Sequence, residues 1–430
     1  MAGMRLSSLF KSPIPGGSFH WLLWSDALTL LSTMVGQVAL PWWIAQSGGA
    51  HDLAVYGVAV SAMSIVMLPL LSPMADRHPK RSLMVAGLLG FALATGAMAV
   101  VASLAHYRLG LVLAIAGVSV AADALVLPAI GSIVTELVPP AGLTRALGLQ
   151  QTAQASGRLV GPAIAGMVLA AVGTAPTLWL GALLLLGAAL VATRLPRPPR
   201  STQARPARKW STEFRVGMRV NWAIPMERGW VLCNFVAAIV LLPCFTMLVP
   251  LKVQSLGLSA TWLGACEAGL SLGMVLGSMG LAQRWTRAQG RFATRFTSSA
   301  AMGLALAVAG WTTEPRLLVA AFVVAGLCNS ATTLVGKTHR MLARPLAFRA
   351  RMAAASIMTI QVSQALGPAL AGLALAHAHV RSVFLMFGLL SAISALGLFL
   401  IPGFRAFMAL DHEQVDNWYG RTYPQVFERH

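Results

Sequence analysis

The hexapeptide GPAIAG at residues 161–166 recurs as GPALAG at residues 367–372, an offset of about two hundred positions. Each copy lies inside a segment of apolar and small residues long enough to cross a hydrocarbon core of about 30 Å. When such segments are numbered along the chain, the first copy falls in the fifth and the second in the eleventh. The match at equivalent positions predicts two copies of a six-helix unit, the alternative being chance similarity between Gly/Ala-rich helices.

The composition is that of a membrane protein. Of 430 residues, 57% are hydrophobic and 10% are charged, and the mean hydropathy is +0.71; soluble domains carry about 25% charged residues. Asp26 and the lack of a small-residue cleavage site argue that the first span is not a signal peptide. The predicted fold class is all-α integral membrane, with twelve transmembrane helices in two pseudo-symmetric six-helix halves. The spans are predicted at 19–43, 54–75, 83–103, 109–131, 143–172, 175–193, 229–251, 260–283, 293–311, 316–336, 351–376 and 381–401.

The net charge of +19 is distributed unevenly along the chain. If both ends are cytoplasmic, most of the 32 Lys and Arg residues lie on the inner side, as the positive-inside rule expects. The charge therefore indicates contact with anionic membrane lipids and no nucleic-acid partner. We expect a multi-pass protein of a bacterial-type plasma (inner) membrane. The outer loops hold Arg108, Lys252, Arg316 and Arg381, and Arg158 lies inside a span.

The predicted domains are an N-terminal half at 1–193, a basic cytoplasmic linker at 194–228, a C-terminal half at 229–404 and a cytoplasmic tail at 405–430. Within the linker, WSTEFRVGMRVNW at residues 210–222 places aromatic residues and a methionine at steps of four. This spacing predicts a helix lying on the inner membrane surface; a solvated loop is the alternative. The residues on the shared face are Trp210, Phe214, Met218 and Trp222.

The segment SPMADRHPKRSLM at residues 72–84 joins the second and third predicted spans. It follows the pattern Gly-x-Leu-Ala-Asp-Arg-x-Gly-Arg-Lys, by which the chain resembles the major facilitator superfamily. The resemblance implies an inner gate in which Asp76 lies near the N-terminus of helix 11, where the helix dipole favours an anion. Ser72 and Pro79 replace the two glycines of the pattern, and an ordinary basic loop is the alternative. The matching charged residues are Asp76, Arg77, Lys80 and Arg81.

The fifth span resembles the helix 5 motif of the antiporters in that superfamily, which tracks with export. Glycines at this spacing allow close helix packing, and Pro162 removes a backbone donor. Ala165 departs from the motif but is still small. A packing seam without significance for antiport is the alternative. The matching residues are Gly148, Gly157, Gly161, Pro162 and Gly166. The stretch LPAIGSIVTELVPPAGLTRALGL at residues 127–149 is similar to the branch that includes the enterobactin exporter and macrolide efflux proteins.

Four charged residues lie more than one helical turn inside the predicted spans: Asp26, Asp123, Arg158 and Glu267. Charges inside a membrane face the bundle interior or a wet cavity and mark ion or substrate paths. We predict that Arg158 pairs with Asp123, Asp26 or both, and that an acid carries a proton because Arg does not deprotonate. A static ion pair is the alternative. Glu267 is a second proton site, a contact for a cation, or a neutral packed residue. The resemblance implies an Arg in helix 4, and none is present there.

These features predict a proton-coupled antiporter that exports a small amphipathic molecule, such as a drug, secondary metabolite or siderophore, by alternating access. An uptake symporter and a non-transporting scaffold or sensor with the same fold are alternatives. A monomer is expected, with membrane lipids and a small-molecule substrate as its contacts. No cofactor or metal is expected, because His377 and His379 form no metal cluster and the proton gradient supplies the energy. An integral-membrane enzyme is not expected, because the sequence shows no catalytic constellation.

Overall fold

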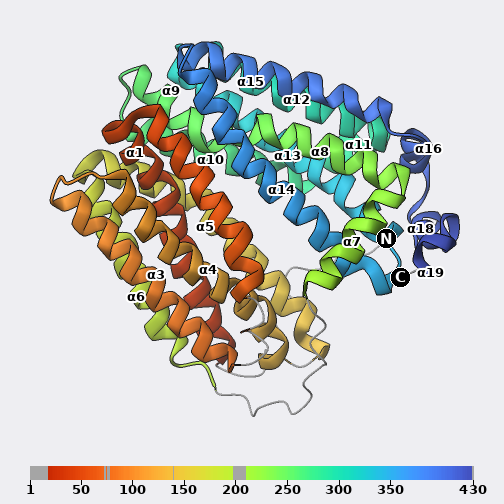
Figure 1. Cartoon of the computed structure of the whole chain (residues 1–430), viewed down its shortest axis with the longest axis horizontal. Helices are drawn as coiled ribbons and strands as arrows, with labels where there is room; N and C mark the ends of the chain where they lie inside the picture. The colour runs from red at the N-terminus through yellow and green to blue at the C-terminus, as the bar shows by residue number, and fades with distance from the viewer. Residues whose placement is uncertain (1–17, 72–73, 75–77, 139, 197–209, 429–430) are drawn as a thin grey trace.

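The structure is a computed structural model that describes residues 18–71, 74, 78–138, 140–196 and 210–428. Those residues form helices arranged in two bundles (Figure 1), which confirms the predicted all-α membrane fold of two six-helix halves. The N-terminal half contains α1 (Ser18–Leu71), α3 (Lys80–Ser103), α4 (Leu109–Leu137), α5 (Pro140–Val172) and α6 (Thr174–Ala192).

The C-terminal half begins with α8 (Pro225–Pro243), which continues through the π-helix η2 (Cys244–Leu248) into α9 (Val249–Ser255). Its second crossing is α10 (Ala260–Leu276), the π-helix η3 (Gly277–Leu281) and α11 (Ala282–Gln289). The others are α12 (Arg291–Trp311), α13 (Pro315–Ala343), α14 (Leu346–Leu375), and α15 (Val380–Ser394) with the 3₁₀ helix η4 (Ala395–Leu400).

Helix α1 contains the first predicted span, 19–43, and residues 54–71 of the second. It has 54 residues, which at 1.5 Å per residue gives a length of roughly 80 Å, far more than one bilayer crossing needs. Gly49 divides it, with φ of 73° and ψ of −166°, a conformation that favours glycine. The chain therefore reverses at Gly49, and the twelve predicted crossings are all accounted for. Within the described residues 11 helices are long and apolar enough to cross a membrane, α1 counted once.

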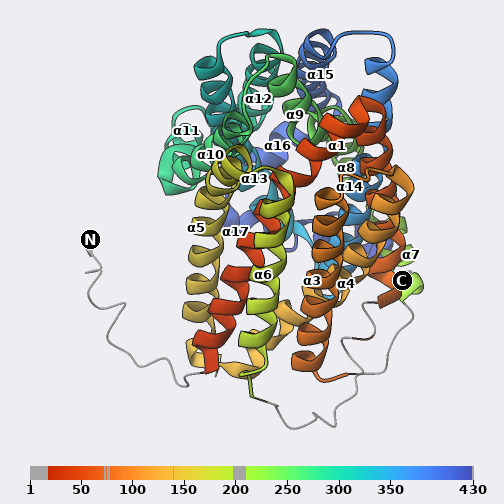
Figure 2. The ribbon, with the colours of Figure 1, turned by 90° about the vertical axis from the view of Figure 1, so that its left-hand side faces the viewer.

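The ends of the helices define two faces of the molecule. The linker face carries the N-terminus of α1, residues 193–196, residues 210–224 and the C-terminal tail, whereas the far face carries Gly49, Gly173 and Gly257 at its turns. Figure 2 shows the helices of the N-terminal half running between these two faces. In Figure 1 the two halves meet at the upper left, on the far face, and diverge towards the linker face at the lower right.

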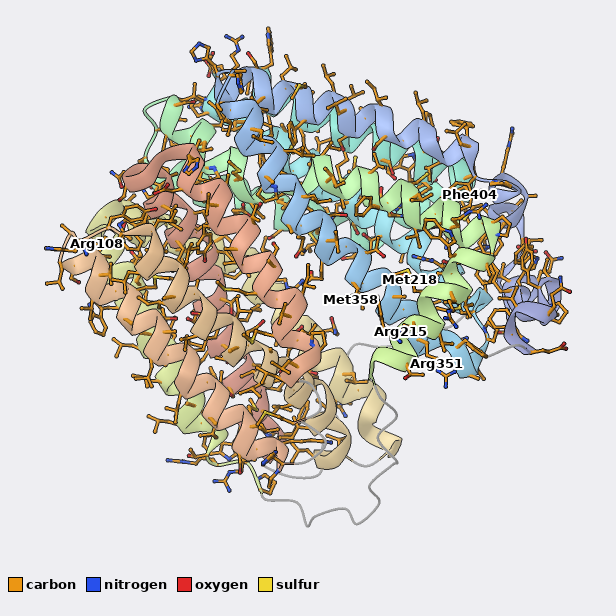
Figure 3. The ribbon with its side chains drawn as sticks, in the orientation of Figure 1. Arg108, Arg215, Met218, Arg351, Met358 and Phe404 are labelled. Carbon is orange, nitrogen blue, oxygen red and sulfur yellow. The ribbon has the colours of Figure 1, made fainter. Side chains whose placement is uncertain are left out.

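Helix α7 (Trp210–Ala223) lies beside α14 on the linker face. Gly217 has no side chain, which allows its backbone to approach the Arg351 carbonyl closely, and Asn221 donates a hydrogen bond of 3.1 Å to the Met352 carbonyl. Figure 3 shows Arg215 and Met218 on α7 next to this part of α14. The helix predicted in the linker is therefore present, and one of its faces is covered by protein.

The C-terminal tail packs against the linker face of the C-terminal half. It contains α16 (Phe404–Ala409), α17 (His412–Val415), α18 (Trp418–Thr422) and α19 (Pro424–Glu428). Tyr419 is fully buried, and burial raises the pKa of its phenol well above the usual range. The Asn417 backbone amide donates 3.0 Å to the Leu342 carbonyl of α13. The tail is thus part of the core of this half, although it follows the last crossing.

Candidate functional site

A cavity of 660 Å³ lies between the two halves, within the usual size range of about 300–1,000 Å³ for small-molecule sites. The N-terminal half contributes residues from α1, α3, α4 and α6, and the C-terminal half contributes residues from α8, η2, α10 and α14. No single half encloses it. A rearrangement of one half against the other would therefore change the cavity directly.

One acid from each half lines this cavity. Asp123 comes from α4 and its side chain is exposed to the cavity, whereas Glu267 comes from α10 and is half-buried. Among the lining residues that the structure describes, there is no Lys, Arg or His. The charges of the cavity wall are therefore negative whenever either carboxyl group is ionised. This juxtaposition was not part of the sequence prediction, which left Glu267 apart from the other three residues.

The remainder of the cavity wall is a mixture of apolar and uncharged polar groups. Tyr56, Phe91 and Phe245 supply aromatic surface. Gln37, Gln361 and Gln364 supply amides, which can donate and accept hydrogen bonds. Phe245, Thr246 and Met247 belong to η2, where the π-helical geometry widens the helix. Such a wall suits a molecule that has both an apolar body and polar or charged groups.

Asp26 lies outside the cavity lining. Its side chain is 5% exposed and accepts a hydrogen bond from the Gln150 amide of α5, while Oδ1 has no partner among the described residues. The neighbouring Ser25 donates a hydrogen bond of 3.1 Å to the Ala188 carbonyl of α6. Asp26 therefore belongs to the packed interior of the N-terminal half, and the structure does not bring it to Asp123.

Arg158 lies on α5 with an exposed side chain. It forms no hydrogen bond or ion pair with any residue that the structure describes, so the predicted pairing with Asp26 or Asp123 is absent in this conformation. Its helical face is nevertheless an interior one, because Pro162, one turn further, is buried and Ala165, two turns further, is fully buried. Arg158 therefore faces the space where the two halves diverge.

The four motif glycines of α5 divide into three groups according to the neighbour that a Cβ at each position would meet. A Cβ on Gly157 or Gly161 would lie 2.7 Å from the Leu30 side chain or 2.8 Å from the Met34 side chain, both on α1. A Cβ on Gly166 would lie 2.7 Å from the Cα of Gly264 on α10, in the other half. At Gly148 it would meet no atom within 4 Å. Gly166 is therefore the member of the motif at the contact between the halves.

A second set of contacts joins the halves along α1 and α14, again near the far face. Ser61 donates a hydrogen bond of 3.1 Å to the Gln364 carbonyl, and a Cβ on Gly57 would lie 3.0 Å from Pro368. The same face of α1 continues along the cavity wall at Ser64 and Leu68. Both seams between the halves are thus closed on the far side of the cavity.

The predicted inner gate lies partly outside the described residues. Asp76 and Arg77 lie outside the described residues, and with them the predicted place of Asp76 near the N-terminus of the eleventh membrane crossing, which is α14. Lys80 begins α3, and the Arg81 guanidinium donates to the Thr193 carbonyl at the end of α6. Arg81 therefore links the ends of two helices of the N-terminal half.

A buried charge cluster on the linker face was missed at the sequence level. Glu227 is fully buried and accepts hydrogen bonds of 2.6–3.0 Å from Arg340 and of 3.3–3.4 Å from Arg344. Ser356 accepts from both guanidinium groups. Glu227 falls within the predicted linker at 194–228, and both arginines fall between the predicted spans at 316–336 and 351–376. Glu227 lies in the first turn of α8, a position that is only a weak indication of a buried ion pair. Its arginine partners lie more than a hundred residues away along the chain.

The model of the Major Facilitator Superfamily matches residues 22–310, two thirds of the chain. The chain belongs to the major facilitator superfamily. It is therefore a membrane transporter rather than an enzyme, and transporters of this superfamily work without a bound cofactor. Among the described residues, no group of three or more His, Cys, Asp or Glu could hold a metal ion.

Solved structures of this superfamily share the fold at low sequence identity. A nucleoside transporter, NupG, matches with a TM-score of 0.72 and 14% identity over 92% of this chain and 100% of that chain. A bacterial homolog to the human lysosomal transporter Spinster, inward-facing and unoccupied, matches with a TM-score of 0.66 and 15% identity over 97% and 99%. A POT family transporter in complex with a peptide conjugate has a TM-score of 0.66 and 13% identity over 89% and 95%. None of the curated protein sequences matches significantly.

Proposed function

We propose that this transporter is a proton-coupled exporter of a small amphipathic molecule, such as a drug or secondary metabolite, and that it works by rocker-switch alternating access. The observation that carries the proposal is the cavity between the halves with Asp123 on one side and Glu267 on the other. Carboxylates in a membrane protein interior are costly and mark ion or substrate paths. The proton gradient of a bacterial-type plasma membrane supplies the energy.

The composition of the cavity wall favours a cationic substrate. An amphipathic cation would place its charge near Asp123 or Glu267 and its apolar part against Tyr56, Phe91 or Phe245. An ionised carboxylate can hold a cation, and a protonated carboxyl group cannot. Exchange of a proton for a cation at these two acids would therefore couple the two movements.

The arrangement of the halves supports access to the cavity from the linker face. The far side is closed by the Gly166–Gly264 and Ser61–Gln364 contacts, and Arg158 is exposed on the linker side. We assign the linker face to the cytoplasm, because it carries most of the Lys and Arg residues. A substrate would then enter from the cytoplasm and leave outside. The helix 5 motif, which resembles that of antiporters, favours the same direction.

The test is binding-coupled proton release by the purified protein in weakly buffered detergent, with tetraphenylphosphonium as the cation and tetraphenylborate as an anion of matched shape. We expect the cation to release protons and the anion to release none, and we expect Asp123→Asn and Glu267→Gln each to reduce the release. Asp52→Asn is the control, since Asp52 bonds Tyr107 near the far face, at 2.9 Å. Unchanged release in both cavity variants would contradict the coupling role of the acids.

Direction is tested in proteoliposomes with an imposed proton gradient and ethidium as the transported cation. Export predicts that ethidium moves against the proton flux, whereas an uptake symporter would move it with the flux. A protein that shows no movement of ethidium or protons, but remains folded, would support the scaffold or sensor alternative.

A further inference from the structure

Helices α5 and α10 cross at a contact between backbones. A Cβ on Gly264 would lie 2.5 Å from the Pro162 carbonyl oxygen, and a Cβ on Gly166 would lie 2.9 Å from the Ala260 carbonyl oxygen. The two helices are antiparallel, because α5 begins at the linker face and α10 begins just after the far-face turn at Gly257. Moving from this crossing towards the linker face therefore means decreasing numbers on α5 and increasing numbers on α10.

Arg158 and Glu267 lie at similar depth on the linker side of this crossing. Arg158 precedes Pro162 by four residues, or about 6 Å, and Glu267 follows Gly264 by three residues, or about 4.5 Å. Glu267 lines the cavity and Arg158 shares its face with buried residues, so both are on the interior side of the seam. They belong to opposite halves and flank the point where those halves begin to separate.

We propose that Arg158 becomes the ion-pair partner of Glu267 when the two halves close on the linker face. Closure removes water from the space that Arg158 now faces, and a permanently charged guanidinium then needs a carboxylate. Asp26 and Asp123 are in the same half as Arg158, and neither is paired with it now. A half that moves as one body keeps those separations, so Glu267, in the opposite half, is the acid that closure can bring to it.

This inference rests on the proposed alternating access and adds a physical reason for release of the substrate cation from Glu267. Glu267 cannot hold a substrate cation and the Arg158 guanidinium at the same time. Closure of the linker face would therefore displace a cation from Glu267 while the far side opens. The pair would favour discharge at the far face, which is the direction of export.

The conformation can be measured without transport, by the distance between spin labels at the linker-face ends of α5 and α10. Leu147→Cys and Leu276→Cys provide exposed sites, in a background with the four free cysteines replaced. We expect Arg158→Gln and Glu267→Gln each to reduce the short-distance population about fivefold or more. The exchanged variant, Arg158→Glu with Glu267→Arg, should restore it. Arg284→Gln, on exposed α11, is the control.

A second measurement is the disulfide between Arg158→Cys and Glu267→Cys, which we expect to form under conditions that favour the short distance and to lock the linker face closed. The ion pair is contradicted if the neutral variants and the exchanged variant all keep the short-distance population of the wild type. That result would not contradict alternating access. Distances that never change, with or without tetraphenylphosphonium, would overturn alternating access as well. Restoration by the exchanged variant, together with a wild-type protein that does not transport ethidium, would support the pair and contradict the proposed substrate class.

Discussion

Two glutamates of the C-terminal half show how surroundings assign different roles to one residue type. Glu227 is fully buried, and its oxygens accept hydrogen bonds from Arg340 and Arg344. Glu267 is half-buried in a cavity wall that has no described cationic residue. The first carboxylate is held by fixed partners, which suits a structural role. The second can exchange partners, which suits a proton, a substrate cation or Arg158.

Glu227→Gln should destabilise the protein by about 3–5 kcal/mol, because it leaves two guanidinium groups buried without a counter-charge. Arg344 is 5% exposed and cannot recover this loss through solvation by water. The measurement is the free energy of unfolding in detergent. Glu314→Gln, at an exposed position on the far face, should change it by less than about 0.5 kcal/mol. Equal effects of the two substitutions would contradict the structural role of Glu227.

At the scale of an element, α5 is a single helix with two different contact surfaces. Gly157 and Gly161 allow it to pack against α1 within its own half, and Gly166 allows it to pack against α10 across the halves. Pro162 lies inside the helix without interrupting it. The sequence motif therefore combines a permanent contact with one that rocking of the halves would change.

Gly166→Ala should destabilise the conformation described here by about 1–3 kcal/mol, since its Cβ would lie 2.7 Å from a backbone atom that cannot rotate away. The change should also favour the linker-closed population in the spin-label experiment, because that conformation separates the far-side contacts. Gly148→Ala is the matched control on the same helix, as its Cβ meets no atom within 4 Å. If Gly148→Ala has the larger effect, the assignment of Gly166 to the seam is wrong.

At the scale of the whole molecule, the linker face of the C-terminal half is covered by segments outside its membrane crossings. The C-terminal half is covered by α7 and by the tail, with Gly217 against α14 and Tyr419 in the core. These segments enlarge that half, and none of their described residues lines the cavity between the halves. The linker face of the C-terminal half is therefore braced by segments that lie outside its membrane crossings.

The orientation of the molecule predicts which face reacts from outside an intact cell. Ala378→Cys, at an exposed far-face turn, should react with a membrane-impermeant maleimide added outside. Ala406→Cys, at an exposed position of α16, should react only after the membrane is permeabilised. Both substitutions are made in a variant whose four native cysteines have been replaced. The reverse pattern would place the linker outside and would contradict the direction of transport that we propose.

The sequence by itself determined the fold class, the number of crossings and the two-half organisation. Whether about 20 consecutive residues are apolar enough to cross a bilayer is a local property, and the repeated GPAIAG/GPALAG motif relates the two halves directly. The turn at Gly49 also fell between the two predicted spans 19–43 and 54–75.

Only the tertiary structure decided which charged residues share a site. It placed Asp123 with Glu267 in one cavity, put Asp26 beside Gln150, and left Arg158 facing the space between the halves. It also joined Glu227 to Arg340, which lies more than a hundred residues away along the chain. Pairings of this kind depend on the relative rotation and separation of helices, and a pattern read along one helix contains neither quantity.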